Sequence, residues 1–177
     1  MNIVLIGFRG TGKSCVGKAI ARCMKRRFID ADDYLEQKVS KTIKEIFSEG
    51  GEKRFRQLES EIIEELTLLD DVVIAAGGGA VLKKENVKNM KRNGFVVLLE
   101  ADIETIHKRL TEDTEGQAQR PGLTNMKQYE EIRYLLEYRR PFYKEAADYR
   151  IDTTKSSINQ LAEKVILAFD AHVQARK

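Results

Sequence analysis

The sequence contains few of the residues on which metal clusters and disulfide-rich folds depend. Among 177 residues there is no tryptophan, and there are only two prolines, two cysteines and two histidines. Cys15 and Cys23 are predicted to lie on one helix, about 12 Å apart, whereas a disulfide needs Cα atoms within about 7 Å. We therefore expect two free thiols in a reducing compartment. His107 and His172 stand alone, so no cysteine–histidine metal site is expected.

Long hydrophobic runs and a large excess of either charge are also missing. No apolar run approaches the roughly 20 residues that cross a bilayer, and the first residues resemble a strand rather than a signal peptide. The net charge of +3 is too small to indicate nucleic-acid binding, although it suits anionic small ligands. We expect a single domain over residues 1–177 that is monomeric and cytoplasmic, with neither nucleic acid nor membrane as a partner.

Residues 7–14, Gly-Phe-Arg-Gly-Thr-Gly-Lys-Ser, fit the phosphate-binding pattern G-x-x-x-x-G-K-[ST]. The apolar run 2–6 before them predicts a buried strand, and apolar residues at helical spacing over 15–25 predict a helix after them. Backbone N–H groups and the helix dipole in such a loop attract a polyphosphate. Lys13 can reach the β- and γ-phosphates, and the Ser14 hydroxyl can bind Mg²⁺. A glycine turn with an exposed lysine would leave these residue choices unexplained, so a nucleotide site is predicted here.

Strand-like and helical patterns alternate along the rest of the chain. This alternation predicts an α/β fold, a three-layer sandwich in which helices flank a five-stranded parallel sheet, as in phosphate-loop kinases. The further strands are expected at 27–30, 72–76, 95–99 and 149–152. Helices are expected at 15–25, 34–39, 42–47, 52–69, 83–93, 102–110, 126–146 and from 157.

Local signals predict where several of these helices begin and end. Thr42 and Glu45 form a capping-box pattern, as do Ser157 and Gln160, and Asp102 is expected to cap the helix that follows it. Gly50-Gly51 is expected to end one helix, and Pro141 to break or kink another.

Polar or glycine-rich residues follow several strands. Because ligands of parallel sheets bind beyond the carboxyl ends of the strands, we expect the phosphate loop, the pair Asp30 and Asp32, and Gly77-Gly78-Gly79 to meet. One carboxylate can serve Mg²⁺ through water while the other orients the hydroxyl of the phosphate acceptor. The alternative, that these acids only favour the start of a helix, stays open. The three glycines indicate a close approach of the backbone to a ligand.

Arginines and a polar segment complete the set of candidates. Arg56 has Glu59 three residues on, and an arginine fork such as that of Arg56 or Arg139 matches a carboxylate, although spacing alone leaves a solvated surface position open. Residues 111–124 have few apolar side chains, which is typical of a functional loop. From that loop Arg120 could reach the transferring phosphate and help to exclude water.

These motifs, in this order, resemble those of shikimate kinases from Gly7 to about Thr153. The resemblance implies a fold of the nucleoside-monophosphate-kinase type and ATP-dependent, Mg²⁺-assisted phosphorylation of the 3-hydroxyl of shikimate, in aromatic amino-acid biosynthesis. The motifs that carry it are the phosphate loop, Asp30-Ala-Asp32, Gly51-Glu52 with Phe55-Arg56 and Glu59, Gly77-Gly78-Gly79-Ala80-Val81, Arg120-Pro121, and Arg139-Arg-Pro-Phe-Tyr143.

The resemblance also implies a role for each candidate residue. Helices over about 31–62 would bind the substrate, and a lid would span about 111–124. Lys13, Asp32 and Arg120 would be catalytic. The ATP-binding residues would be Gly10, Thr11, Gly12, Lys13, Ser14, Cys15, Arg120 and Lys155; Mg²⁺ would be held by Ser14 and Asp30. Shikimate would be held by Asp32, Arg56, Glu59, Gly78, Gly79 and Arg139.

The sequence departs from the shikimate kinase pattern at two places. The family commonly has an arginine beside the adenine shortly before the lid, where this chain reads Leu110-Thr-Glu-Asp-Thr-Glu115; Arg109 could take that role from a shifted position. The usual Arg-Pro-Leu-Leu of the lid is Arg120-Pro-Gly-Leu here, and Gly122 is expected to loosen the hinge of the lid.

Three other functions compete with this interpretation. A kinase of the same fold could phosphorylate gluconate or a nucleoside monophosphate, although the Asp-x-Asp, Phe-Arg and triple-glycine series argues against it. A non-catalytic nucleotide switch of the GTPase kind would need an Asn-Lys-x-Asp element, which the sequence lacks. An inactive kinase-like protein is disfavoured because Lys13, Asp32, Arg56 and Arg120 are all present.

Overall fold

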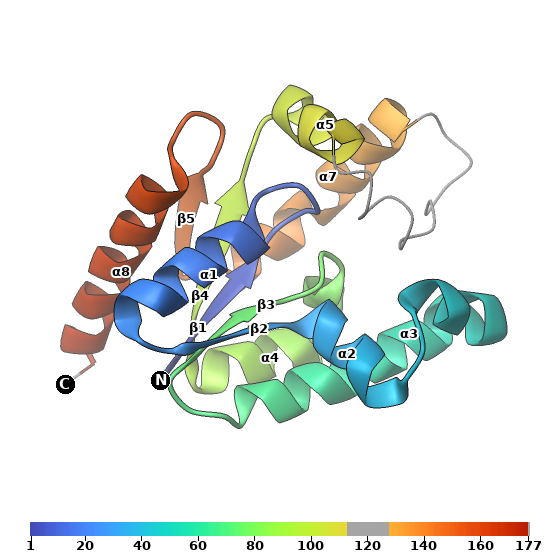
Figure 1. Cartoon of the computed structure of the whole chain (residues 1–177), viewed down its shortest axis with the longest axis horizontal. Helices are drawn as coiled ribbons and strands as arrows, with labels where there is room; N and C mark the ends of the chain where they lie inside the picture. Colours follow the sequence, from blue (N-terminus) through green and yellow to red (C-terminus); the bar gives the residue numbers. More distant parts are fainter. Residues whose placement is uncertain (113–127, 177) are drawn as a thin grey trace.

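The centre of the molecule is a five-stranded parallel sheet with the strand order β2-β3-β1-β4-β5 (Figure 1). The computed structural model describes residues 1–112 and 128–176. The strands are β1 (Asn2–Ile6), β2 (Arg27–Asp30), β3 (Val72–Ala75), β4 (Gly94–Glu100) and β5 (Tyr149–Asp152). The predicted number, position and direction of the strands are confirmed.

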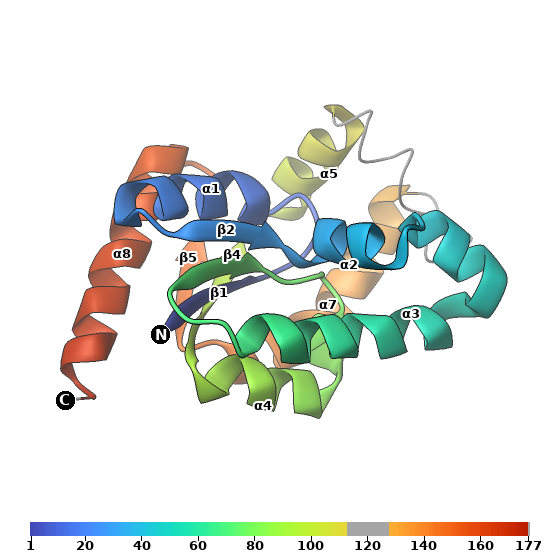
Figure 2. The same cartoon turned by 60° about the horizontal axis from the view of Figure 1, so that its bottom comes forward.

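Helices cover both faces of the sheet, as the apolar strands predict. Figures 1 and 2 show α1 and α8 together on one face, α3 and α4 on the other, and α5 and α7 near the carboxyl ends of the strands. The helices are α1 (Lys13–Met24), α2 (Ala31–Val39), α3 (Ile43–Thr67), α4 (Lys84–Arg92), α5 (Ile103–Glu112), α7 (Gln128–Ala146) and α8 (Ile158–Gln174), with a 3₁₀ turn, η1 (Ala80–Leu82). The layers are therefore helix, sheet and helix.

Alternate residues of the central strand explain how both layers are held. In β1, Ile3 and Leu5 pack in the core shared with α1 and α8, whereas Val4 and Ile6 pack in the core shared with α3 and α4. All four side chains are 0% exposed. Because successive side chains of a strand point to opposite faces, one apolar run of four residues anchors helices on both sides.

The helix boundaries match most of the local signals. The predicted end of a helix at Gly50-Gly51 is present, because Gly51 has φ 64° and ψ −172°, a non-helical conformation open to glycine, and this kink divides α3 into two helical parts. Helix α7 ends at Ala146, as predicted, and Pro141, where a break or kink was expected, does not break it; the buried side chains of Tyr143 and Ala146 hold its last turn in the core. Helix α5 extends to Glu112, two residues into the segment expected to be a lid.

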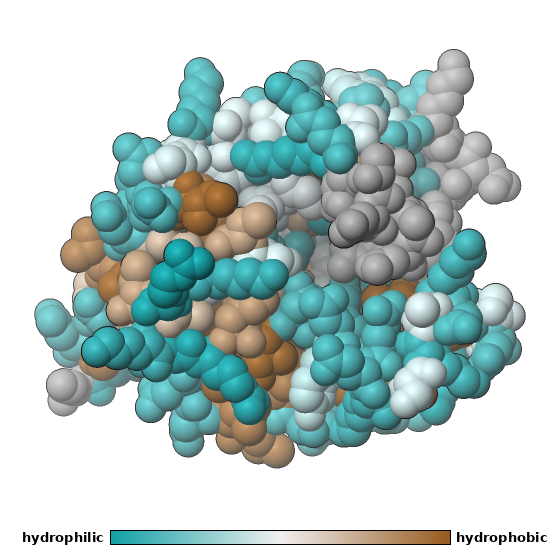
Figure 3. Space-filling view, in the orientation of Figure 1, coloured by the Kyte–Doolittle hydropathy of each residue, from teal (hydrophilic) through white to brown (hydrophobic). Residues whose placement is uncertain are grey.

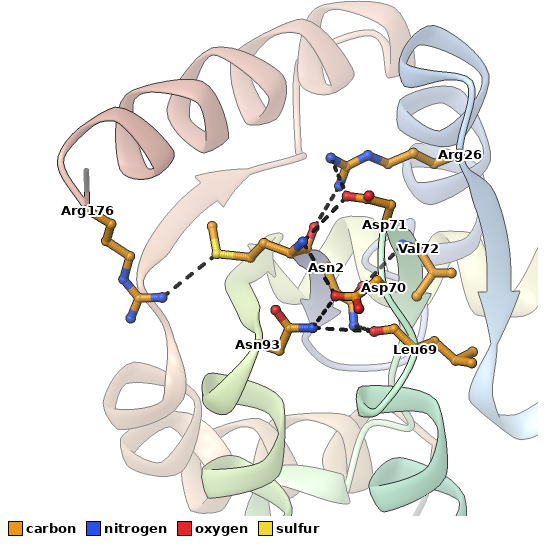
Figure 4. Close-up of polar contacts among 9 residues, drawn as sticks. Asn2, Arg26, Leu69, Asp70, Asp71, Val72, Asn93 and Arg176 are labelled. Carbon is orange, nitrogen blue, oxygen red and sulfur yellow. Dashed lines mark hydrogen bonds and ion pairs between the residues drawn. The ribbon is translucent and has the colours of Figure 1, made fainter.

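A polar network joins the amino ends of the strands, opposite the phosphate loop (Figure 4). Asn2 is 1% exposed; its Nδ2 donates to Leu69 O at 2.6 Å, and its Oδ1 accepts from Val72 N at 3.1 Å. Arg26 pairs with Asp71 at 3.1 Å. One buried amide thus ties β1 to the turn that leads into β3.

Hydrophilic side chains cover most of the face seen in Figure 3, and hydrophobic ones gather in its left and lower central parts. Within the described ranges 1–112 and 128–176, no helix is long and apolar enough to cross a membrane.

Candidate active site

The phosphate loop, residues 7–14, connects β1 to α1 at the carboxyl end of the sheet. Gly7, Gly10 and Gly12 have φ of 141°, 80° and 91°, values that residues with a Cβ rarely adopt. Lys13 Nζ donates to Gly7 O at 2.9 Å and to Phe8 O at 3.0 Å, so its ammonium lies over the loop. Since Lys13 is also the first residue of α1, the loop places a cation and a helix amino terminus together. This arrangement suits a polyphosphate.

Ser14 and Asp30 meet next to the loop. Ser14 Oγ donates to Asp30 Oδ2 at 2.7 Å, and Asp30 Oδ1 accepts from Asp32 N at 3.1 Å, which caps α2. The pair brings together a hydroxyl and a carboxylate, both oxygen ligands of the kind that Mg²⁺ takes. No three His, Cys, Asp or Glu side chains are grouped for a metal ion in the part of the chain that the structure describes. The pair therefore fits a Mg²⁺ that takes its other ligands from phosphates and water.

A pocket lies beside the loop, between the ends of the strands and α3. Its charged side chains include Asp32, Glu59 and the arginines 9, 56 and 139, and its wall is aromatic and aliphatic. The lining residues are Phe8, Arg9, Asp32, Ile43, Phe47, Phe55, Arg56, Glu59, Gly77, Gly78, Gly79 and Arg139. The pocket thus brings together all six residues expected to hold the substrate.

Arg56 is fixed by carboxylates on its own helix. Its Nη1 donates to Glu59 Oε2 at 2.9 Å, and its Nε and Nη2 each donate to Glu52 Oε1 at 3.2 Å. Burial favours the neutral form of Arg56, but these carboxylates outweigh it and raise the pKa of Arg56. Burial also raises the pKa of Glu59, which is 4% exposed, and Arg56 opposes that shift. The predicted support of Arg56 by Glu59 is present in the geometry.

Arg139 reaches the pocket from α7. It is 6% exposed, its Nη1 donates to Gly78 O at 3.3 Å, and its guanidinium lies 5.7 Å from the centre of the Phe8 ring. Its Nε is buried without a hydrogen-bond partner among the described residues. Tyr143 OH donates to the same Gly78 O at 2.5 Å, and burial raises the pKa of Tyr143 to about 12, so the phenol remains a donor at neutral pH. An anionic ligand would supply the acceptor that Arg139 lacks.

Space, not backbone conformation, explains most of the triple glycine. A Cβ at Gly77 would lie 2.7 Å from Glu59 Oε1 and 2.9 Å from Asp32 Oδ1, and a Cβ at Gly79 would lie 2.3 Å from Arg56 Nη1. At Gly78 the nearest atoms would be 3.5 Å away, an ordinary contact. Gly77 and Gly79 therefore let charged side chains approach the backbone, whereas the sequence suggested a ligand in that place.

Several residues of the pocket were not predicted to line it. Phe8 and Arg9 occupy variable positions of the loop pattern, which gives no sign that they face an acceptor. Arg9 Nη2 pairs with the buried Glu131 of α7 at 2.8 Å, a contact between residues far apart in sequence. The aromatic pair Phe47 and Phe55, with ring centres 4.8 Å apart, also lines the pocket, although Phe55 was named only as part of the Phe-Arg motif and no role was predicted for Phe47.

Other predicted residues lie away from the pocket or beyond the described ranges. Arg120, Gly122 and most of the expected lid fall in 113–127, outside the described residues. Lys155 is exposed, two residues after Thr153, whose Oγ1 donates to Thr11 O of the loop. Arg109 donates to Gly10 O at 3.2 Å. Cys15 is a free, exposed thiol in the first turn of α1.

The fold and the site define a small-molecule kinase with a phosphate-binding loop: a polyphosphate cradle at a sheet edge faces a second, carboxylate- and arginine-lined pocket. A protein-family model described as shikimate kinase matches residues 9–170. The chain therefore belongs to the shikimate kinase family. A shikimate kinase of Thermodesulfovibrio yellowstonii is 43% identical over 169 residues, which cover 96% of this chain and 95% of that protein.

Solved structures agree with this family. A shikimate kinase from Acinetobacter baumannii, solved in complex with shikimate, is 35% identical, with a TM-score of 0.89 over 97% of this chain and 93% of that one. A gluconokinase from Sinorhizobium meliloti is only 15% identical, with a TM-score of 0.57 over 98% of this chain and 96% of that one. The second similarity shows a common fold alone.

Proposed function

We propose that this protein transfers the γ-phosphoryl group of ATP to the 3-hydroxyl of shikimate, giving shikimate 3-phosphate and ADP. The proposal is supported by its membership of the shikimate kinase family. The observation that carries it is the pocket beside the phosphate loop, where Asp32 lies with Arg56 and Arg139. A substrate that carries both hydroxyl and carboxylate groups needs both kinds of side chain. The carboxylate of Asp32 can accept hydrogen bonds from its hydroxyls, and the guanidinium groups of the arginines can pair with its carboxylate.

The acceptor side of the reaction is assigned to the pocket. Arg56 and Arg139 clamp the carboxylate of shikimate, Glu59 supports Arg56, and the backbone at Gly78 and Gly79 contacts substrate oxygens. Asp32, in the first turn of α2, orients the 3-hydroxyl and accepts its proton as the new P–O bond forms. The bond from the γ-phosphorus to ADP breaks in the same transfer, and the aromatic wall limits the access of water.

The donor side is assigned to the phosphate loop. Gly10, Thr11, Gly12 and Cys15 bind phosphate through the loop and the start of α1, and Lys13 holds the β- and γ-phosphates. Ser14 and Asp30, 2.7 Å apart, would hold Mg²⁺, which when bound neutralises charge on the transferring phosphate. Arg120 would add a further charge at that phosphate, and Lys155 a contact near the adenine.

The test is an assay of ADP release with shikimate, gluconate and nucleoside monophosphates as parallel acceptors. Shikimate is expected to raise the rate of ADP release at least about 100-fold over the rate without an acceptor. The other acceptors are expected to leave the rate near that of the acceptor-free enzyme, because they would leave polar groups of the pocket without hydrogen-bond partners. Chelation of Mg²⁺ should abolish the shikimate-dependent rate. A preference for gluconate or a nucleoside monophosphate would contradict the proposal.

The enzyme is proposed to act as a cytoplasmic monomer made of one domain.

A further inference from the structure

Two carbonyl groups of the phosphate loop are held by side chains from outside the loop. Arg109 on α5 donates from Nη1 to Gly10 O at 3.2 Å. Thr153, the residue after β5, donates from Oγ1 to Thr11 O at 3.0 Å. The loop is thereby fastened to two elements that are distant from it in sequence.

Arg109 and Thr153 are also bonded to each other. Arg109 Nη1 donates to Thr153 Oγ1 at 3.1 Å, and Nη2 donates to Thr153 O at 2.8 Å. The threonine hydroxyl thus accepts from Arg109 and donates to Thr11, and both threonines are 1% exposed. Hydrogen bonds that share a charged donor and are shielded from water are stronger than isolated exposed ones. The arginine, the threonine and the loop form one connected network.

Helix α5 also restricts the conformation of the phosphate loop by packing against its backbone. A Cβ at Gly10 would lie 3.2 Å from Leu110 Cγ and 3.4 Å from Ile106 O, so the backbone of the loop runs directly against this helix. Gly10 and Gly12 have positive φ, which gives the loop a conformation that collects N–H groups around an anion.

Peptide planarity connects the held carbonyls to the groups that bind phosphate. The carbonyl of Gly10 shares a rigid plane with the N–H of Thr11, which donates to Phe8 O at 3.3 Å and closes the turn of the loop. The carbonyl of Thr11 shares a plane with the N–H of Gly12, at the start of α1, where phosphate is proposed to bind. A side chain that fixes either oxygen therefore fixes the direction of the next N–H. Arg109 and Thr153 act in this way on two consecutive peptide planes.

We propose that Arg109 and Thr153 are positioning residues that hold the phosphate loop in its polyphosphate-binding conformation. The inference rests on the proposed use of ATP and deepens it. It also assigns Arg109 an effect on the phosphates through the loop, in place of the contact with adenine considered from the sequence.

The experiment compares two probes by calorimetry: ADP, which has a base, and inorganic tripolyphosphate, which has none. The variants Arg109→Met and Thr153→Val each remove hydrogen bonds to the loop. Each is expected to weaken the binding of both probes by a similar factor of about 5 to 20, in line with the loss of one or two partly or fully buried hydrogen bonds. Shikimate binding, measured on the same samples, is expected to stay within about twofold, which shows that the variants are folded.

Two further variants separate position from charge. Lys108→Met removes a cation from the next residue of α5, whose side chain is 75% exposed, and should leave both probes within about twofold. Arg109→Lys keeps the charge but cannot bridge Gly10 and Thr153 at once, and should weaken both probes nearly as much as Arg109→Met. Thr153→Ser, which keeps the hydroxyl, should restore most of the affinity that Thr153→Val loses.

Two results would overturn the inference. Loss of ADP affinity with tripolyphosphate unchanged in Arg109→Met would make Arg109 a contact of the base. Unchanged affinity for both probes in Arg109→Met and Thr153→Val would show that the network does not hold the loop in its binding conformation. Because these measurements need no phosphoryl transfer, a failure of shikimate turnover in the unmodified enzyme would contradict the proposed function and leave this inference standing.

Discussion

At the scale of the residue, charged side chains of the acceptor pocket occupy the space that a Cβ at Gly77 or Gly79 would need. Gly79 has φ −103°, which any residue can adopt, so the only obstacle to alanine there is the guanidinium of Arg56, which would have to move. The same holds for Gly77, whose missing Cβ leaves room for the carboxylates of Glu59 and Asp32. The positions of these charges therefore depend on the glycines as much as on the helices that carry the charges.

The first prediction concerns Gly79→Ala. The added methyl group would lie 2.3 Å from Arg56 Nη1, so the guanidinium must move and the carboxylate clamp is spoiled. We expect the KM for shikimate to rise about tenfold or more, a loss of roughly 1.4 kcal/mol, while the KM for ATP stays within about twofold. Steady-state kinetics with each substrate varied in turn measures both. Gly78→Ala, with its nearest atoms 3.5 Å away, should have a distinctly smaller effect. Equal effects of the two variants would contradict the role given to space at Gly79.

The second prediction concerns Asp32→Asn, which keeps the shape of the side chain but removes its negative charge. An amide cannot take the proton of the acceptor hydroxyl, so kcat is expected to fall by about 100-fold or more. ATP affinity should remain within about twofold, because Asp32 is assigned to the acceptor. Single-turnover kinetics and a nucleotide titration measure the two quantities. The matched control is Asp33→Asn, one residue along α2 and exposed, which should retain a near-normal kcat. Near-normal turnover of Asp32→Asn would remove Asp32 from this role.

At the scale of the element, the sequence indicates how helices start better than it indicates how they end. The capping boxes at Thr42 and Ser157 and the cap at Asp102 are confirmed, since each depends on residues within one turn. The passage of α7 through Pro141 without a break could not be predicted in this way. Proline favours an end, but the core contacts of Tyr143 and Ala146, made with residues distant in sequence, stabilise the turn after Pro141.

The third prediction concerns the pH dependence of the α5 cap. Hydrogen bonds from Thr105, of which the one from its backbone N to Asp102 Oδ1 measures 2.7 Å, lower the pKa of Asp102. A carboxyl whose pKa is lower in the folded state stabilises folding above its unfolded pKa of about 4, and this contribution is lost as the pH falls through the folded value. Asp102→Asn keeps a capping oxygen without the charge. We therefore expect the melting temperature of the unmodified protein to exceed that of the variant at pH 7, and the difference to shrink below about pH 4. Thermal unfolding at a series of pH values measures it, and a difference that grows in acid would contradict the cause given.

At the scale of the whole molecule, the parallel sheet separates the chemistry from the structural network at its other end. The sequence predicts which segments meet at the carboxyl edge, because strand direction alone brings them there. It does not predict that Arg9 of the loop pairs with Glu131 of α7, or that the guanidinium of Arg139 lies over the ring of Phe8. Those contacts depend on how α7 packs, and local patterns carry no information about it.

The last prediction uses this separation. Asn2 lies at the amino edge of the sheet, 1% exposed, and its amide satisfies Leu69 O and Val72 N (Figure 4). Asn2→Ala leaves Val72 N without this partner and leaves Leu69 O with the longer bond from Asn93 Nδ2, at 3.4 Å. This loss should lower the free energy of unfolding by about 2–3 kcal/mol and the melting temperature by about 5–10 °C. The values of kcat and KM measured well below the transition should stay within about twofold, because the site lies at the opposite end of every strand. Asp70→Asn, in the same network but with its side chain 74% exposed, is the control and should change the free energy of unfolding by less than about 0.5 kcal/mol. A large loss of kcat in folded Asn2→Ala would show that the two edges of the sheet are coupled and would contradict the separation of the site from this network.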